Sequence, residues 1–291
     1  MRGRVLGCHS DLAVVQLTDG REVRCRLRGR LRLQRSGIQP AVVAGDLVEV
    51  GLHQGSHVVE EVLPRRNLLP RPLVANVDQV LVVFARDEPP LDVRYVGRVL
   101  VTAERAGLDG VLVLSKADLL GLAEEEEVRS LFTPVPYPLV VTSAVTGRGL
   151  EELRGRLQGR VSVLAGPSGV GKSRLLNALH PGLSLQTGEL SRLKRGRHTT
   201  RLARLLPVAG GTVADTPGFS APALVDVPPR EVASLFPEFD DLALRCRFSD
   251  CYHRSEPGCA VREAVETGQV ARWRYDLYLD LVEESEAGQK W

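Results

Sequence analysis

The sequence predicts a multidomain α/β protein, because three stretches of the chain differ in their pattern of apolar, glycine and cysteine residues. Residues 1–66 hold short β-branched segments punctuated by glycine, a pattern that favours an N-terminal OB-like β-barrel. Residues 67–226 alternate apolar runs with helical stretches, which indicates a parallel sheet with helices on both faces. Residues 227–291 combine a cysteine cluster with a helical pattern, so we expect a small C-terminal helical domain there.

The composition is that of a globular protein. Its 291 residues are 43% hydrophobic and 25% charged, enough for two or three domains. No segment approaches the roughly 20 apolar residues that a membrane-spanning helix needs, and the N-terminus lacks the apolar core of a signal peptide. We therefore expect a cytoplasmic monomer with no membrane partner.

A basic strand stands out in the first part of the chain, where arginine takes every second position from residue 24 to 32 and apolar residues or Gly29 take the positions between. Such alternation places all the arginines on one strand face: Arg24, Arg26, Arg28, Arg30 and Arg32. A solvated face is one interpretation. However, five like charges repel unless a polyanion neutralises them, and a barrel with a basic face is the usual shape of an oligonucleotide-binding fold. The pattern favours contact with RNA or DNA.

The middle part reads as repeated strand and helix units. We expect strands over 77–85, 110–115, 138–144 and 160–166, with helices over 93–107 and 149–157 and an acidic segment over 121–132. The last strand runs into "GPSGVGKS" and a helix, which is the context that a phosphate-binding loop requires. Lys172 would reach the β and γ phosphate oxygens, and the Ser173 hydroxyl would bind Mg²⁺. The expected phosphate-binding residues are Gly166, Pro167, Ser168, Gly169, Val170, Gly171, Lys172, Ser173 and Arg174.

Two further motifs follow the phosphate loop in the chain. "VADTPGF" places Asp215 at the end of a strand, where it would hold the metal ion through water, and Gly218 where its N–H would meet the γ-phosphate. The second motif, "GRHTT", lies between the phosphate loop and "VADTPGF". A hydroxyl of Thr199 or Thr200 would complete the magnesium shell there, and Thr200 is our candidate.

The motif "SKAD", Ser115 to Asp118, is the candidate for reading the base. The Asp118 carboxylate can accept from both donors on the Watson–Crick edge of guanine, which adenine does not present, while the stem of Lys116 lies along the base plane. One strand later, the backbone of Ser143 and Ala144 would support the carbonyl of the base. "SKAD" alone also fits an ordinary strand-to-helix turn with an N-capping Asp, but the second base loop favours guanine. The whole segment, Ala117 included, is therefore assigned to base binding.

The order of these motifs is unusual, because the base loops precede the phosphate loop. Both assignments hold if the domain is circularly permuted, so that its base-binding half comes first. A sheet tolerates such a reconnection when the old chain ends lie near each other. The sequence thus predicts a circularly permuted P-loop GTPase domain over 67–226, between a barrel over 1–66 and a third domain over 227–291.

The C-terminal part carries a candidate metal site. In a reducing cytosol, clustered cysteines indicate metal ligation before disulfides. The cluster offers a Cys₃His set suited to one closed, structural zinc site with no position left for water: Cys246, Cys251, His253 and Cys259. The alternative is reduced surface cysteines near a chance histidine. Residues 261–285 read as one helix, with Trp273, Tyr275 and Tyr278 as packing or contact residues, and Cys8 and Cys25 are expected in a core.

Taken together, the base loops, "GPSGVGKS", "GRHTT" and "DTPGF", preceded by a basic barrel and followed by a Cys/His cluster, resemble the ribosome small-subunit-dependent GTPase A (RsgA) family. The resemblance covers all three parts of the chain. It implies binding of GTP and GDP with Mg²⁺, and contact with the small (30S) ribosomal subunit and its rRNA late in assembly. It further implies GTP hydrolysis that the subunit stimulates and that drives release.

Two positions bear on how such a GTPase would work. Gly218 is followed by Phe219, which cannot orient the attacking water as a glutamine does in many GTPases. His198 is the nearest candidate for a catalytic residue, which the resemblance supports; a solvated loop histidine is the alternative. The family usually has Asn where this chain has Ser115, so we expect Ser115 to lose hydrogen bonds to guanine N7 and to the phosphate loop.

Two other classes of function remain open at this point. One is an ATP-dependent enzyme that uses the same phosphate loop, which "SKAD" disfavours. The other is a non-catalytic zinc and RNA-binding module whose nucleotide site is only structural.

Overall fold

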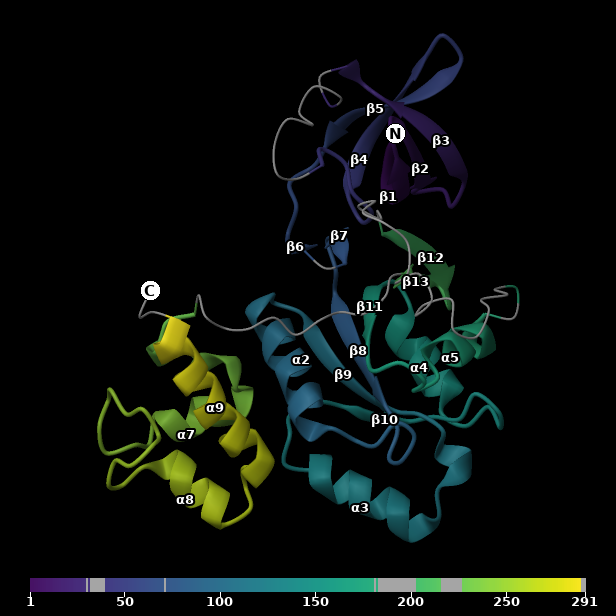
Figure 1. Ribbon diagram of the computed structural model, residues 1–291. Coiled ribbons are helices and arrows are strands. Elements are labelled where there is room, and N and C mark those ends of the chain that lie inside the picture. The colour runs from purple at the N-terminus through teal and green to yellow at the C-terminus, as the bar shows by residue number, and fades with distance from the viewer. Residues whose placement is uncertain are drawn as a thin grey trace.

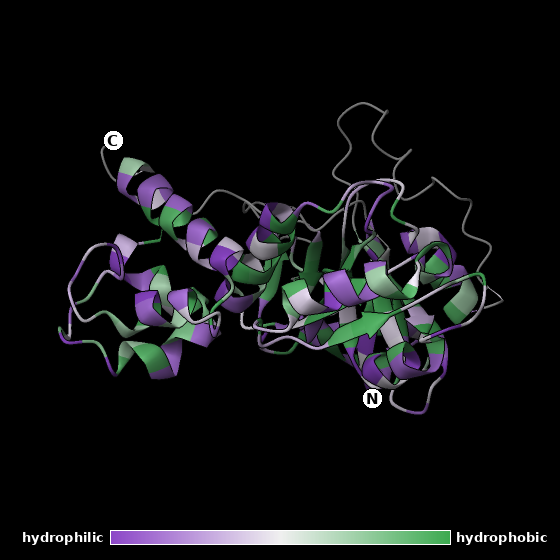
Figure 2. Ribbon diagram, turned by 90° about the horizontal axis from the view of Figure 1, so that it is seen from below, coloured by the Kyte–Doolittle hydropathy of each residue, from purple (hydrophilic) through white to green (hydrophobic). Residues whose placement is uncertain are grey.

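The computed structural model describes residues 1–29, 31, 40–70, 72–180, 182, 203–215 and 227–288, with the backbone alone at Asp215. A β-barrel, a mixed sheet flanked by helices and a small helical domain follow one another along the chain (Figure 1). Figure 2 shows apolar residues gathered in the strands of the central sheet. Within the described part of the chain, no helix is both long and apolar enough to cross a membrane.

The N-terminal barrel is closed by strands in the order β1-β2-β3-β5-β4. Strands β3 and β5 pair in parallel, whereas the other described pairs are antiparallel. Five closed strands with this mixed pairing match the OB-like barrel expected from the sequence. Alternate residues such as Val15, Cys25 and Val59 fill the barrel core, as expected for Cys25. The bounds are Arg2–His9 (β1), Leu12–Leu17 (β2), Glu22–Leu27 (β3), Leu47–His53 (β4) and Ser56–Val62 (β5).

The basic strand is shorter than the sequence pattern predicted. In β3 the alternation holds, since Arg24 and Arg26 are exposed while Leu27 is buried. The strand ends at Leu27, because the chain then turns and the N–H of Leu31 donates to the carbonyl of Arg28 at 2.9 Å. Arg28 is exposed just beyond the strand. Arg30 and Arg32 lie outside the described residues.

A two-stranded ribbon that the sequence did not predict links the barrel to the sheet. It consists of β6 (Leu68–Pro70) and β7 (Leu73–Ala75). Gly45 approaches this ribbon so closely that a Cβ atom there would lie 1.9 Å from the carbonyl oxygen of Ala75. The buried Asp46 carboxylate pairs with Arg65 at 2.7 Å. These contacts fix the end of the barrel against the linking segment.

The central sheet has the strand order β10-β9-β8-β11-β13-β12. All neighbours pair in parallel except β12, which is antiparallel to β13. The β12 strand was not foreseen; it lies at the edge of the sheet and contains Pro207, a residue that edge strands tolerate. The bounds are Gln79–Phe84 (β8), Asp109–Leu114 (β9), Leu139–Val141 (β10), Val161–Ala165 (β11), Arg204–Val208 (β12) and Gly211–Asp215 (β13).

Helices cover both faces of this sheet, as expected from its buried, apolar strands. Val80, Val82 and Phe84 of β8 share one core with residues of α2 and α3, whereas Leu81 and Val83 share the other with residues of α4 and α5. The bounds are Val93–Arg105 (α2), Leu122–Phe132 (α3), Leu150–Leu157 (α4) and Lys172–Leu179 (α5).

The C-terminal domain contains two main helices where the sequence predicted one. The chain breaks at Gly268, whose φ of +76° suits glycine, and the N–H of Val270 donates back to Ala264 at 3.0 Å. The helices are α7 (Asp240–Ala243), α8 (Ala260–Glu266) and α9 (Arg272–Gly288), with 3₁₀ turns η3 (Pro229–Glu231), η4 (Ala233–Leu235) and η5 (Pro237–Phe239).

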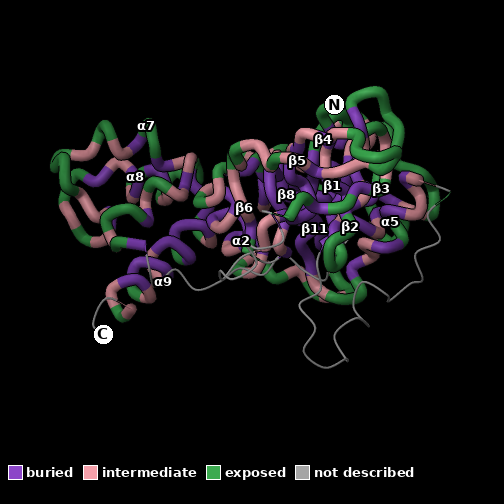
Figure 3. Tube along the Cα trace, turned by 90° about the horizontal axis from the view of Figure 1, so that it is seen from above, coloured by how far each residue is buried: buried purple, intermediate pink, exposed green. Residues whose placement is uncertain are grey.

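Helix α9 docks this domain onto α2, and Figure 3 shows the buried residues along it. A Cβ atom at Gly97 of α2 would lie 2.4 Å from Leu277 Cδ2, so the two helices approach very closely. The Trp273 indole donates to the carbonyl of Leu131 at 3.2 Å. Two ion pairs cross the same interface, Arg94 with Asp280 and Arg98 with Glu284.

Candidate functional site

The phosphate loop connects β11 to α5. Gly166 has a φ of +147°, and a Cβ atom there would lie 2.2 Å from the carbonyl oxygen of Val83, so the position requires glycine. Gly171 precedes the helix with a φ of +99°. The loop therefore presents its backbone at the N-terminus of α5, where N–H groups and the helix dipole favour an anion.

The Lys172 ammonium lies within the curve of this loop. Its Nζ donates to the carbonyl oxygens of Gly166 and Pro167, at 2.7 Å each. Ser173 is buried in the first turn of α5, while Arg174 and the loop residue Ser168 are exposed. Phosphate oxygens can compete with those two neutral carbonyls for the ammonium, because an ammonium–phosphate bond joins two opposite charges, whereas an ammonium–carbonyl bond has only one charged partner.

Tyr95 of α2 also holds the loop, and sequence reasoning missed it. Its hydroxyl oxygen accepts a hydrogen bond from the N–H of Gly166 at 3.1 Å. Burial raises the pKa of Tyr95, so the phenol stays protonated. No sequence pattern marks this residue, since only the sheet brings α2 next to the loop.

The first base loop follows β9 at the same edge of the sheet as the phosphate loop. The two loops are two strands apart, with β8 between β9 and β11. The Ser115 hydroxyl lies 2.7 Å from the carbonyl oxygen of Val170 in the phosphate loop and 3.0 Å from that of Phe84. The expectation that Ser115 loses its hydrogen bond to the phosphate loop was therefore wrong, because the shorter side chain still reaches Val170.

The next residues of this loop have a constrained backbone. Lys116 adopts a left-handed conformation with a φ of +58°, and its Nζ donates to the carbonyl of Glu88 at 2.6 Å. The turn η2 (Ala117–Leu119) follows, and the N–H of Ala117 donates to the carbonyl of Thr142 at 3.0 Å. The two base loops are thus joined through their main chains.

The exposed Asp118 carboxylate is oriented by a buried serine. The hydroxyl of Ser143 donates to Asp118 Oδ1 at 2.5 Å. The Ser143 hydroxyl oxygen in turn accepts from the N–H groups of Val145 and Thr146, at 3.2 and 3.1 Å. Sequence reasoning assigned only the backbone of Ser143 and Ala144 to the site. The Ser143 side chain adds a fixed direction to the carboxylate that would read the base.

Only part of the expected metal and catalytic set falls on described residues. The backbone of Asp215 ends β13, which runs parallel to β11 beside the phosphate loop. His198, Thr199, Thr200, Gly218 and Phe219 lie outside the described residues.

The cysteine cluster gathers at one point of the C-terminal domain. The ligand atoms of Cys246, Cys251, His253 and Cys259 all lie within 4.8 Å of one another. His253 Nδ1 is 3.5 Å from the sulfur of Cys246 and 3.4 Å from that of Cys259, and these two sulfurs are 4.0 Å apart. A regular tetrahedral zinc site has S···N and S···S separations of about 3.6 and 3.8 Å. The donor set and its spacing therefore fit one zinc ion.

The loop that carries these ligands is held by its neighbours. The Tyr275 hydroxyl donates to the carbonyl of His253 at 2.6 Å, and the Tyr278 hydroxyl donates to that of Tyr252 at 2.7 Å. The Glu256 carboxylate accepts N–H bonds from Tyr252, Arg254 and Ser255. Burial alone would raise the pKa of Glu256, but these backbone bonds lower it to about 2. The hydroxyl groups of Tyr275 and Tyr278 and the carboxylate of Glu256 therefore all position the ligand loop. Of the two roles expected for the tyrosines, these contacts indicate packing.

A P-loop sheet whose base loops precede its phosphate loop in the chain defines a circularly permuted GTPase, here flanked by an OB-like barrel and a Cys₃His domain. The RsgA GTPase family model matches residues 62–225. This chain belongs to the RsgA GTPase family, and it is a GTP hydrolase.

Relatives and solved structures agree along nearly the whole chain. The chain is 46% identical to the small ribosomal subunit biogenesis GTPase RsgA of Moorella thermoacetica, covering 98% of this chain and 97% of that one. The crystal structure of YjeQ from Thermotoga maritima is similar with a TM-score of 0.83 and 42% identity, covering 98% of each chain. YloQ, described as a circularly permuted GTPase, matches with a TM-score of 0.81 and 30% identity over 98% of this chain and 95% of its own.

Proposed function

We propose that this GTPase acts in biogenesis of the small ribosomal subunit. It binds the 30S subunit and its rRNA late in assembly, the subunit stimulates GTP hydrolysis, and hydrolysis drives release. The observation that carries the proposal is the hydrogen bond from Ser115 to Val170, which joins the base loop to the phosphate loop within one sheet edge. Full-length relatives that are named small ribosomal subunit biogenesis GTPases support the ribosomal part.

The nucleotide would lie along this sheet edge, as ligands of parallel sheets do. Asp118, oriented by Ser143, would accept from the two guanine donors, with Ser115, Lys116, Ala117 and Ala144 around the base. The loop from Gly166 to Arg174 would hold the phosphates, with Lys172 at the β and γ oxygens and Gly218 at the γ-phosphate. Ser173, Thr200 and, through water, Asp215 would hold Mg²⁺, which neutralises phosphate charge when bound.

Hydrolysis in this site would rest mainly on positioning and electrostatics. The Lys172 ammonium already lies against the loop carbonyls, so it is near the expected phosphate position. Phe219 cannot hydrogen-bond to water, so intrinsic turnover is expected to be slow. We assign the missing group to His198; turnover of His198→Ala with subunits present, together with its GTP affinity, tests that role.

The barrel would supply the rRNA contact. Arg24, Arg26 and Arg28 are exposed at β3 and just beyond it, and we propose Arg30 and Arg32 as further contacts to the rRNA. We place the domain boundaries at 1–66, 67–226 and 227–291, with one structural zinc ion in the last domain. A cytoplasmic monomer is the form that we propose.

Sedimentation with purified small subunits tests the proposal. Binding should be much tighter with a non-hydrolysable GTP analogue than with GDP, because contact between the γ-phosphate and the loop at Gly218 would favour the conformation that binds the subunit. The variant Arg24→Gln/Arg26→Gln should bind more weakly with a salt dependence shallower by about 1 to 2 in slope. Arg272→Gln removes an exposed arginine on α9, outside the barrel, and is the control. Equal subunit affinity in both nucleotide states would contradict the switch.

A further inference from the structure

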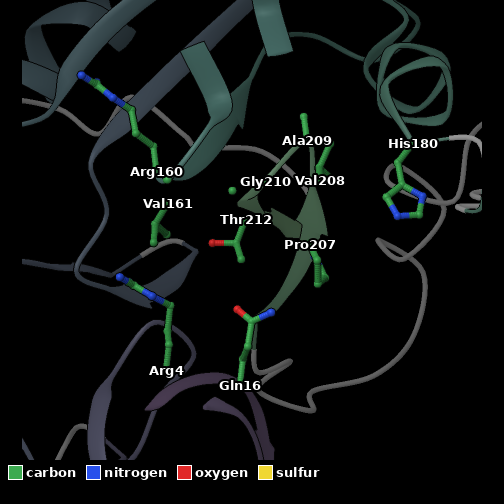
Figure 4. A pocket seen from close by; sticks show the side chains of 12 residues that line it. Arg4, Gln16, Arg160, Val161, His180, Pro207, Val208, Ala209, Gly210 and Thr212 are labelled. Atoms are coloured by element: carbon green, nitrogen blue, oxygen red, sulfur yellow. The ribbon is translucent and has the colours of Figure 1, made fainter. Parts of the chain in front are cut away.

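A cavity of about 290 Å³ lies where the barrel meets the central sheet, at the edge opposite the nucleotide loops (Figure 4). The barrel contributes residues of β1 and β2, and the sheet contributes the start of β11 and the β12–β13 hairpin. Strands β11 and β13 run from this cavity to the nucleotide edge, a distance of about 15 Å at the usual rise per residue. The cavity is therefore separate from the site described above.

The barrel side of the cavity presents two polar side chains. Arg4 and Gln16 are paired across β1 and β2, so their side chains stand next to each other on one face. Figure 4 shows the Gln16 side chain rising from the barrel toward Thr212, with Arg4 beside it. Arg4 Nη1 is buried and has no hydrogen-bond partner. This guanidinium is held at the junction without full pairing.

The sheet side presents two more unpaired polar atoms. Thr212, near the start of β13, is only 6% exposed, and its Oγ1 has no partner. His180 follows α5, and its buried Nδ1 also has none. Among the described residues, five buried side-chain nitrogen or oxygen atoms have neither a hydrogen bond nor an ion pair, and three of these belong to residues that line this cavity. Buried polar groups are normally paired, so this concentration marks a polar cavity whose donors water or a bound ligand would satisfy.

Arg4 is the charged residue that bears on this cavity. The lining residues include Arg4 and Arg160 and no Asp or Glu, but the Arg160 side chain points away from the other lining residues (Figure 4). Arg160 pairs with Asp109 at 2.6 Å. The nearby carboxylate of Asp78 is engaged by Arg66 and by the N–H of Val161.

Burial lowers the pKa of Arg4, while Asp78 opposes the shift and Arg66 adds to it. The guanidinium remains charged but has lost hydrating water. An anion that entered the cavity would restore partners to this charge.

We propose that this junction is a second anion site that binds a phosphate group. Arg4 and Gln16 would donate from the barrel and Thr212 from the sheet side, after rotations about their side-chain bonds. Donors on two facing walls suit a tetrahedral oxyanion better than a planar carboxylate. Because both domains contribute, bound phosphate would hold the barrel against the GTPase sheet.

Calorimetric titration of inorganic phosphate into the full-length protein tests the site. The protein is first saturated with Mg²⁺ and a non-hydrolysable GTP analogue, so that the phosphate loop is filled. We expect one saturable phosphate site, at least tenfold weaker in Arg4→Gln. Arg2→Gln is the matched control, since Arg2 lies on the same strand but is exposed and pairs with Glu49; its phosphate affinity should not change.

A second variant guards against a folding defect. Thr212→Val keeps the side-chain shape and removes an unpaired hydroxyl, so it should fold at least as well and bind phosphate severalfold more weakly. Amide chemical shifts of Gly210, Gly211 and Thr212 should move on phosphate addition. Analogue affinity, measured for each variant, keeps a failure of this site distinct from a failure of the nucleotide site.

The phosphate has two possible sources, free phosphate or the backbone of RNA. A parallel titration with a short single-stranded RNA distinguishes them. RNA binding that depends on Arg4 while inorganic phosphate does not bind would support the site and assign it to an RNA phosphate. Phosphate and RNA affinities that are both unchanged in Arg4→Gln and Thr212→Val would overturn the proposal.

Discussion

Asp118→Asn should remove most of the affinity for guanine nucleotides. The carboxylate is fixed by the Ser143 hydroxyl at 2.5 Å, so both of its oxygens have defined directions. An Asn of the same shape offers one acceptor and one N–H₂ group, which would face a guanine donor. A hydrogen bond to a charged group contributes about 1.5 to 3 kcal/mol and a neutral one about 1 kcal/mol, so losing one bond and making the other neutral should together cost about 3 to 4 kcal/mol. That cost corresponds to a roughly 150- to 900-fold rise in Kd.

Calorimetric titration with GDP and with xanthosine diphosphate measures this effect. The Asn variant should gain affinity for the xanthine nucleotide relative to GDP, because xanthine replaces one donor with an acceptor. Ser143→Ala is the control: it keeps the carboxylate and loses only its orienting bond, so GDP binding should fall by about 1 kcal/mol. Unchanged GDP affinity in Asp118→Asn would mean that "SKAD" is only a turn.

Three further predictions concern the metal, acid stability and domain docking. Metal analysis should find about one zinc per chain, lost in Cys251→Ser with lower thermal stability but retained in Cys8→Ala; a zinc-free protein of equal stability would refute the metal site. The folded pKa of Glu256, about 2, lies below its ordinary value of 4.5, so its contribution is present above pH 4.5 and lost as the pH falls toward 2. The melting-temperature difference between the protein and Glu256→Gln should therefore shrink over that window, and a constant difference would contradict it. Gly97→Val should destabilise the protein by about 1 to 3 kcal/mol in urea unfolding, because Leu277 occupies the space of the new side chain. Gly155→Ala, in open space within α4, should not destabilise it.

Residues whose role follows from local backbone chemistry could be predicted from the sequence. The glycines of the phosphate loop, the strand that leads to Asp118 and the spacing of Cys246 to Cys259 each specify a local geometry. The structure places the corresponding loops at one sheet edge and brings the four metal ligands together. The OB-like barrel could also be predicted, because successive side chains of its strands alternate between the core and the surface.

Contacts between distant segments could not be predicted in this way. Tyr95 reaches Gly166 only because α2 packs beside the loop across the sheet, and Ser115 reaches Val170 only because β8 sets the spacing between two other strands. The helix break at Gly268 was missed because the apolar spacing continues through it, although the backbone turns with a positive φ.

Helix α2 links the phosphate loop to the C-terminal domain. It touches the phosphate loop through Tyr95 and the C-terminal domain through Arg98, so one helix contacts both sites. The chain segment between Gly218 and the C-terminal domain would be the other route by which the nucleotide affects that domain. Subunit binding by Gly97→Val in both nucleotide states distinguishes the α2 route from the segment after Gly218. If α2 carries the coupling, the affinity difference between the two states should shrink in this variant, and otherwise it should remain.

GTP turnover measured with and without purified small ribosomal subunits tests the central claim most directly. The account predicts slow turnover by the protein alone, because Phe219 cannot position water, and turnover many times faster when subunits are added. An equal rate in the presence and absence of subunits, from protein that binds GTP normally, would contradict the account.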